Sequence, residues 1–452
     1  MRVSMKVPNK ILGKIFAITK GIHLNQPTNL SVRTDGFTSG DGTSVGRRQV
    51  VWWITFEAVR ETQELASMVK DFDSQLADAD RPTIQLEIDR VIKDNMFNDE
   101  LFNIRDVLYR RAPTLFDAIA SSNKQEFAER LWEKIYQALI NLIPSWLSIY
   151  PLRGVASASA DIGFDGLSLM SPNDEKRWQE YITRYPSTVH FEQSKGSPER
   201  FSSPTIWDIK LPTAEENKPF TWLVCEAKGT RHGVKRIVAG RMRTFIAVLF
   251  SLWHPSSGDF FVVKSDLGEH RCSIQFAPAG NREENSIIPE NIGRLMPSLI
   301  VNFAVSSSNI TQLRDWYTRL YSAHEELQRR AIAASHFLHY GIMADGLQRF
   351  INYYIALDAL FGERHKVEEN IRKGIEQMFP NDQAWIYRAD RLFDLRSELV
   401  HGGTSSIDGW KDFDAYMRHV RTSPSEDAAN AAMTALRTYF INPPQFLTLP
   451  PA

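Results

Sequence analysis

A run of helix patterns, each closed by a strong helix breaker, constrains the fold of this chain more than any other feature. The segment Phe350–Gly362 is strongly apolar, and Val367–Phe379 is amphipathic and followed by a proline. A third pattern runs from Asp382 to Val400 and ends at two glycines; its apolar residues, three or four apart or a multiple of that, are Ile386, Leu392, Leu395 and Leu399. The sequence therefore predicts three successive helices, in a domain expected over residues 308–442.

The third pattern ends on a pair of residues with acid–base and phosphate chemistry. Arg396 precedes His401, and Gly402 and Gly403 follow, so the histidine is predicted at a helix terminus. An arginine stays charged and offers a planar fork of donors to a phosphate, whereas the unperturbed pKa of histidine, about 6.5, suits proton transfer near neutral pH. Two such residues can cleave RNA without a metal ion.

The strings "YIALDALFGE" and "LFDLRSELVHGG", separated by a short amphipathic helix, resemble the Apea-like branch of the HEPN superfamily, all-α domains that often act as ribonucleases. The resemblance is close over residues 350–403 and extends over 308–441; the first 300 residues show none. The family motif, an arginine, four to six residues and a histidine, falls on Arg396 and His401. Ser397 matches the variant typical of this branch, and the family's supporting glutamate is replaced by Asp358.

The resemblance implies a mechanism and a biological setting. HEPN ribonucleases pair as homodimers, need no metal or other cofactor, and cut RNA to a 2′,3′-cyclic phosphate and a 5′-OH. His401 is implied as acid and base, and Arg396 as the group that stabilises the phosphorane. Relatives act as toxins or effectors in bacterial antiviral defence by abortive infection. Residues 1–300 would then serve as a sensor or a restraint of the ribonuclease. The expected signal is a phage-derived trigger or a neutralising partner.

Other interpretations of the same residues stay open at this stage. The helical bundle could be a non-catalytic dimerisation or RNA-binding module, and Arg396 a surface cation paired with Asp394 or Glu398. A different class is a Mg²⁺-dependent nuclease, because Glu226-Ala-Lys228 matches the Glu-x-Lys half of such a signature and Asp208 could supply the second carboxylate. The motif is short, and a solvated strand face is the more ordinary explanation of these residues.

Residues 1–150 and 151–298 are predicted as a mixed α/β N-terminal region, which makes the chain an α+β multi-domain protein. Residues 1–60 are predicted as strands and loops, with a strand at Val50–Phe56 and a polar turn at Thr38–Gly46, and helices are expected from Glu61 to Leu147. Beyond Pro151, we expect strands at Pro219–Lys228 and Asp259–Lys264, a helix at Val234–Trp253 and a linker at Asn281–Ser298.

Positive charge is concentrated in residues 228–243. The chain has a formal net charge of −1, and residues 308–452 hold 16 Lys and Arg against 18 Asp and Glu, so the bundle alone is not expected to bind RNA tightly. The stretch 228–243 contains six cations and no acid; these candidate RNA contacts are Lys228, Arg231, Lys235, Arg236, Arg241 and Arg243. A solvated helix face is the alternative.

Composition excludes several classes. Of the 452 residues, 43% are apolar, enough for buried cores, and the apolar runs Phe245–Trp253 and Ala138–Leu147 are far shorter than the ~20 residues of a membrane span. Cys225 and Cys272 show neither metal-ligand spacing nor a disulfide framework and are predicted as core residues. No apolar signal segment follows Met1, so a cytoplasmic location without membrane contact is expected.

Overall fold

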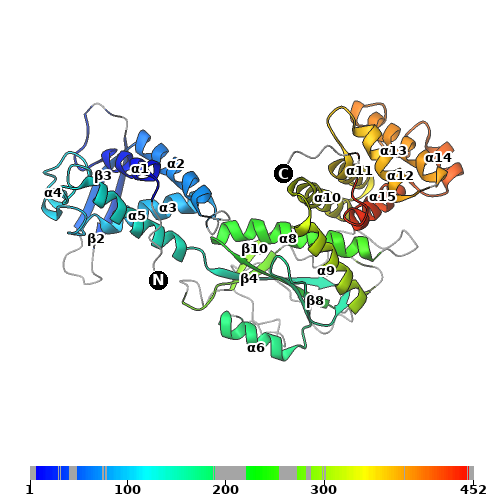
Figure 1. Cartoon of the computed structure of the whole chain (residues 1–452), viewed down its shortest axis with the longest axis horizontal. Helices are drawn as coiled ribbons and strands as arrows, with labels where there is room; N and C mark the ends of the chain where they lie inside the picture. The colour runs from blue at the N-terminus through cyan, green and yellow to red at the C-terminus, as the bar shows by residue number, and fades with distance from the viewer. Residues whose placement is uncertain are drawn as a thin grey trace. The chain divides into compact units, whose positions relative to one another are not determined.

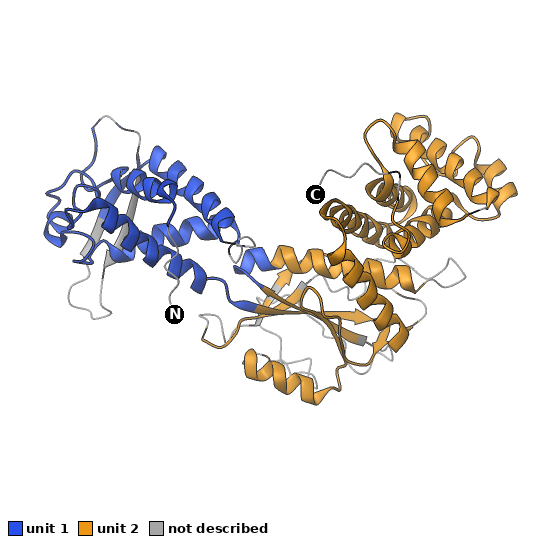
Figure 2. Ribbon diagram, viewed as in Figure 1, with its two compact units in different colours: residues 1–145, 228–234 blue, residues 146–227, 235–452 orange. Residues whose placement is uncertain are grey.

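The chain folds into two compact units, Met1–Ser145 with Lys228–Val234 and Trp146–Ala227 with Lys235–Ala452, coloured separately in Figure 2. The fold is mixed α/β with a helical C-terminal region, as expected (Figure 1). Among the described helices, none combines the length and apolar character that crossing a bilayer requires. The computed structural model describes residues 7–28, 30, 32–39, 48–73, 76, 79–186, 188, 220–253, 272–280, 287–297, 299, 302–380, 382–444 and 446.

The first unit packs helices against a small sheet of order β1-β3-β2. Its elements are α1 (Asn9–Lys20), β1 (Ile22–His23), β2 (Val32–Ser39), β3 (Arg48–Thr55), α2 (Phe56–Phe72), α3 (Arg81–Asn95), α4 (Ile104–Leu108) and α5 (Lys124–Asn141). The expected strand at Val50–Phe56 is confirmed as β3, and the helices after Glu61 as α2 to α5. Of the polar turn Thr38–Gly46, residues 40–46 lie outside the described part.

The prediction of strands and loops throughout residues 1–60 was wrong for α1. Ile11, Ile15 and Ile18 recur at helical spacing and are buried in the core of the first unit. The helix has no side-chain N-cap, because Pro8 occupies that position. The start signal that sequence reasoning depends on is therefore missing, although the apolar period is present.

The second unit is built on a six-stranded sheet of order β10-β9-β4-β8-β7-β6. The strands and their neighbours are β4 (Ser145–Arg153), β5 (Val155–Ser157), β6 (Ala160–Asp161), β7 (Leu167–Met170), α6 (Glu175–Arg184), β8 (Phe220–Lys228), α8 (Arg231–Leu252), β9 (Cys272–Phe276), β10 (Ile287–Asn291) and β11 (Phe303–Val305). Helices α6 and α8 lie on opposite sides of the sheet (Figure 1). Trp178 of α6 packs into a core with Trp222 and Phe276.

Several predictions for this region are confirmed. The strand at Pro219–Lys228 is β8, the helix at Val234–Trp253 is α8, and Cys225 is fully buried. The expected strand Asp259–Lys264 and the side chain of Cys272 lie outside the described part. The predicted linker Asn281–Ser298 contains β10, which pairs with β9, so these five residues belong to the sheet.

The C-terminal region of the second unit is helical. The helices are α9 (Ser307–Ser322), α10 (Glu325–Met343), α11 (Gly346–Phe361), α12 (Val367–Met378), α13 (Gln383–His401), α14 (Phe413–Val420) and α15 (Pro424–Thr438). The three helices whose positions the sequence predicts are confirmed as α11, α12 and α13. Capping boxes start α9 at Ser306 and α15 at Ser423. The helical region also contacts α8, because the Thr244 hydroxyl of α8 and the Ser335 hydroxyl of α10 lie 3.0 Å apart. The three-part domain division stays a prediction.

Candidate active site at the end of α13

The end of α13 confirms the local prediction for His401. The Asp382 side chain accepts hydrogen bonds from the backbone N–H groups of Ala384 and Trp385, which fixes where the helix begins. Gly402 adopts the left-handed conformation, with φ of 79°, and its N–H donates to the Glu398 carbonyl. A residue with a Cβ is strained there, so glycine ends the helix. His401 is thereby held in the last turn, with its side chain exposed.

Arg396 lies half-buried and interacts with α11. Burial raises the pKa of the Asp358 carboxyl, and the positive charges of Arg396 and Arg330 act in the opposite direction. The charge of Arg396 thus reaches the position of the supporting acid that the resemblance implies, but the two side chains form no ion pair within 4 Å among the described residues. Gly362 leaves room for the Asp358 carboxyl, because a Cβ at Gly362 would lie 1.8 Å from Asp358 Oδ1.

The alternative role for Arg396, an ion pair with a neighbour on α13, does not occur among the described residues. Asp394 pairs with Arg391 at 3.1 Å, and Glu398 pairs with Lys411 at 2.6 Å. Both carboxylates are therefore engaged elsewhere. The charge of Arg396 instead opposes the rise in the pKa of Asp358, a half-buried carboxylate of α11.

Helix geometry separates the two side chains of the motif. Five residues along an α-helix correspond to a rise of about 7.5 Å and a rotation of about 140°. Arg396 and His401 therefore leave α13 on different sides.

Sequence reasoning missed Tyr354, which lies one turn before Asp358 on α11. Its hydroxyl is buried and makes no hydrogen bond with any part of the chain that the structure describes. Burial raises the pKa of this hydroxyl, and the charge of Arg396 opposes the shift. Tyr354 and Asp358 lie on one face of the helix because they are four residues apart, and that spacing was the available signal. Ser397 is partly exposed beside Arg396.

Of the three residues of the Mg²⁺-nuclease alternative, the structure describes Glu226 and Lys228. Glu226 Oε1 accepts hydrogen bonds from Arg184 Nη1 at 2.8 Å and from the Tyr185 hydroxyl at 2.7 Å. Lys228 is exposed at the end of β8, and Asp208 lies outside the described residues. Within the described ranges, no three His, Cys, Asp or Glu side chains gather where they could hold a metal ion. Glu226 is therefore engaged in an internal network.

The six cations of the stretch 228–243 do not form one exposed face. Lys235 pairs with Glu290 at 3.3 Å, and Arg241 Nε lies 3.4 Å from Asp165. Arg243 donates to the Ile292 carbonyl at 2.9 Å and lies over the ring of Tyr340. Arg231 is half-buried, and Lys228 and Arg236 are exposed. Three of the predicted RNA contacts thus have internal partners.

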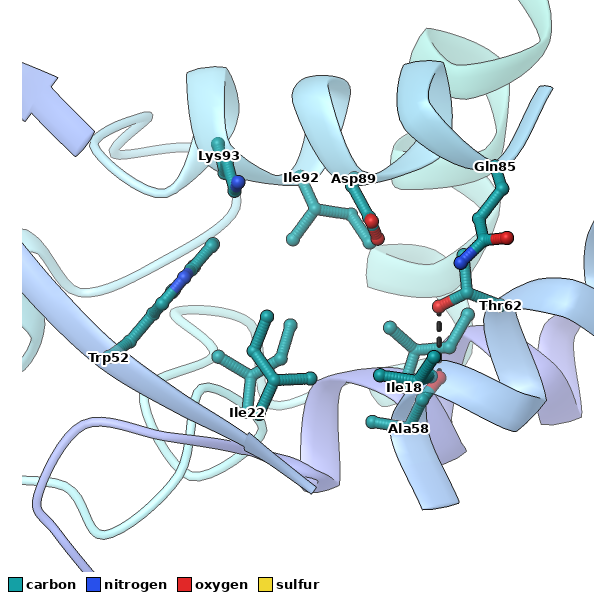
Figure 3. A pocket seen from close by; sticks show the side chains of 11 residues that line it. Ile18, Ile22, Trp52, Ala58, Thr62, Gln85, Asp89, Ile92 and Lys93 are labelled. Carbon is teal, nitrogen blue, oxygen red and sulfur yellow. Dashed lines mark hydrogen bonds between the residues drawn. The ribbon is translucent and has the colours of Figure 1, made fainter. Parts of the chain in front are cut away.

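A hollow in the first unit lies between α3 and the elements around β1 and β3 (Figure 3). One wall is apolar, with Ile18 and Ile22, and Asp89 and Lys93 of α3 lie opposite, with Lys93 over the ring of Trp52. The free space is narrow enough that it holds about one water molecule. It is too small for an organic ligand.

Compared with protein-family models, with curated proteins and with solved structures, the chain gives no match in any of the three. The comparisons thus neither support nor contradict the resemblance to HEPN domains. Arguments about function depend on the residues of α11 and α13 and on the chemistry that they offer.

Proposed function

We propose that the chain is a metal-independent endoribonuclease of the HEPN type. One observation carries the proposal: the charge of Arg396 acts on the half-buried Asp358 carboxyl, and His401 is exposed at a glycine-capped helix end. The family motif has an arginine and a histidine at these two positions of α13. An exposed imidazole can exchange protons with a substrate, and an arginine stays charged and can stabilise an anion.

The proposed reaction is a transesterification within the RNA strand. His401 removes the proton from a ribose 2′-OH, and the resulting oxygen attacks the adjacent phosphorus. The partner subunit's His401 gives a proton to the departing 5′-oxygen, while Arg396 stabilises the charge of the phosphorane. The bond to the 5′-oxygen breaks, which leaves a 2′,3′-cyclic phosphate and a 5′-OH. DNA is not cut because it lacks the nucleophile.

A homodimer through the helical region follows from the need for two imidazoles. The separation of Arg396 and His401 around α13 supports this arrangement, because one copy presents them on different sides. In the proposed setting the enzyme is a cytoplasmic effector of bacterial antiviral defence, and its activity damages RNA and arrests the infected cell. Residues 1–300 would then sense a phage-derived trigger or restrain the activity.

The test compares cleavage of labelled RNA by wild-type protein, His401→Ala and His419→Ala in the presence of EDTA. His419 is an exposed histidine of the same region whose ring centre lies 4.4 Å from that of Tyr387, so its removal is a matched control. We expect cleavage by wild type and His419→Ala, and a loss of about 10²-fold or more in His401→Ala. Equal activity in all three proteins would contradict the proposal.

If purified protein is inactive, growth arrest on expression in cells provides the second readout. Wild type and His419→Ala are then expected to arrest growth, and His401→Ala to be tolerated. Arrest by all three at equal protein levels would remove His401 from the mechanism.

A further inference from the structure

The first unit carries a segment, Tyr109–Phe116, that holds two arginines and no acidic residue. Its backbone is fixed beside β1: the Leu24 N–H donates to the Pro113 carbonyl at 3.0 Å, and the Leu115 N–H donates to the Ile22 carbonyl at 2.8 Å. The segment is therefore a rigid edge of the unit rather than a free loop.

Cations from this segment and from two helices lie on aromatic rings. Lys20 and Lys124 Nζ lie 4.8 and 3.9 Å from the centre of the Phe116 ring. The guanidinium carbon of Arg110 is 5.3 Å from the Trp53 ring, and that of Arg111 is 5.5 Å from the Tyr109 ring. These seven residues form what we call the aromatic–basic surface: Lys20, Trp53, Tyr109, Arg110, Arg111, Phe116 and Lys124.

Most of the cation–π contacts of the first unit are gathered on this surface. Of the five among its described residues, four lie on the aromatic–basic surface. Each is an electrostatic attraction between a cation and the face of an aromatic ring.

The four cations of the surface are exposed and unpaired with carboxylates. Within the described residues, none of Lys20, Arg110, Arg111 and Lys124 has an Asp or Glu oxygen within 4 Å. Elsewhere in the same unit, Lys14 pairs with Glu61 and Arg130 with Glu126, each at 2.6 Å. The charge of the surface is therefore available to an anionic partner.

We propose that the aromatic–basic surface binds single-stranded RNA. The cations neutralise successive phosphates, and the rings offer faces on which unpaired bases stack. Tyr109 has 62% of its surface exposed, enough to receive a base. A duplex keeps its bases stacked inside and does not use the rings, and an acidic peptide would use only the charge. Binding at this surface needs neither Arg396 nor His401, so it goes beyond the proposed reaction.

The experiment measures binding of a fluorescent, unstructured RNA by anisotropy over a range of salt concentrations. The full chain carries His401→Ala throughout, so that no cleavage occurs. The double variant Arg110→Gln, Arg111→Gln is expected to bind more weakly and to lower the slope of log affinity against log salt by about 1.4. Tyr109→Ala is expected to weaken binding about fivefold or more, with rescue by Tyr109→Trp.

The matched control is Arg60→Gln with Arg130→Gln, which removes the same charge from exposed, carboxylate-paired positions of the first unit. It is expected to leave affinity within about twofold of the parent. If Arg110→Gln, Arg111→Gln fails to fold, Lys20→Gln with Lys124→Gln tests the other end of the surface. Absence of RNA binding at low salt, equal losses in the control, or equal competition by duplex RNA or an acidic peptide would overturn the proposal. Binding without cleavage by the wild-type chain would instead count against the ribonuclease alone.

Discussion

The end of α13 and the aromatic–basic surface of the first unit are suited to different tasks. Residues 308–452 hold slightly more acids than bases, and the group to which we assign proton transfer there is the exposed imidazole of His401. The segment Tyr109–Phe116 has two cations, two aromatic rings and no acid. In our proposals, the helical region cleaves RNA and the first unit binds it. Variants in one place should therefore leave the function of the other unchanged.

The largest effect is expected from Arg396→Lys. The substitution keeps a positive charge but loses the planar fork, so cleavage should fall about 10²-fold or more, as when one donor to a transition-state anion is removed. RNA affinity should stay within about twofold of wild type. The control is Arg391→Lys, on the same helix and paired with Asp394. A parallel loss of binding and cleavage would break the division of tasks.

The next effect is a loss of stability of the second unit as the pH falls. His339 is fully buried, its Nε2 lies 2.8 Å from the Leu295 carbonyl, and burial lowers its pKa to about 3. Below the unfolded value of about 6.5 the unfolded chain binds a proton that the folded chain does not, so stability falls as the pH falls from 6.5 towards 3. At pH 5 the loss is about 2 kcal/mol.

The pH effect can be measured by urea unfolding at pH 7 and pH 5. The free energy of unfolding of the wild-type protein should fall between pH 7 and pH 5. That of a His339→Gln variant should fall less, whatever its value at pH 7. Equal losses in both proteins would show that other groups cause the acid sensitivity.

The smallest effects distinguish two buried tyrosines of the helical region. The Tyr354 hydroxyl has no hydrogen-bond partner among the described residues, so Tyr354→Phe should change the free energy of unfolding by less than about 1 kcal/mol and leave cleavage within about threefold. The Tyr416 hydroxyl donates to the buried Asp427 carboxylate, so Tyr416→Phe should destabilise by about 1–3 kcal/mol. A large fall in cleavage by Tyr354→Phe alone would make its hydroxyl part of the active site.

Local signals were sufficient for the helical region. The capping residue Asp382, the apolar period of α13 and the two glycines after His401 fixed both helix ends, because each acts on neighbouring residues. The same reasoning failed at α1, where Pro8 supplies no side-chain cap. The resemblance pointed to Asp358 as the supporting acid, but no local pattern could show whether its short side chain, on another helix, comes under the influence of Arg396.

The two basic regions show why binding surfaces are harder to predict. The cations of 228–243 are consecutive in sequence, but the helix α8 turns Arg241 and Arg243 towards internal partners. On the aromatic–basic surface, Lys20 and Lys124 are far apart in the chain and meet over the ring of Phe116, whereas Arg110 lies over Trp53. A surface of this kind depends on tertiary contacts that no local pattern contains.

The central claim is tested most directly by the chemistry of the product ends. RNA is incubated with the wild-type chain in EDTA, and the fragments are identified by mass spectrometry beside those of His401→Ala. The account predicts 2′,3′-cyclic phosphates and 5′-OH ends that are absent from the variant. Fragments with 5′-phosphate and 3′-OH ends, or the same cyclic products from His401→Ala, would contradict it.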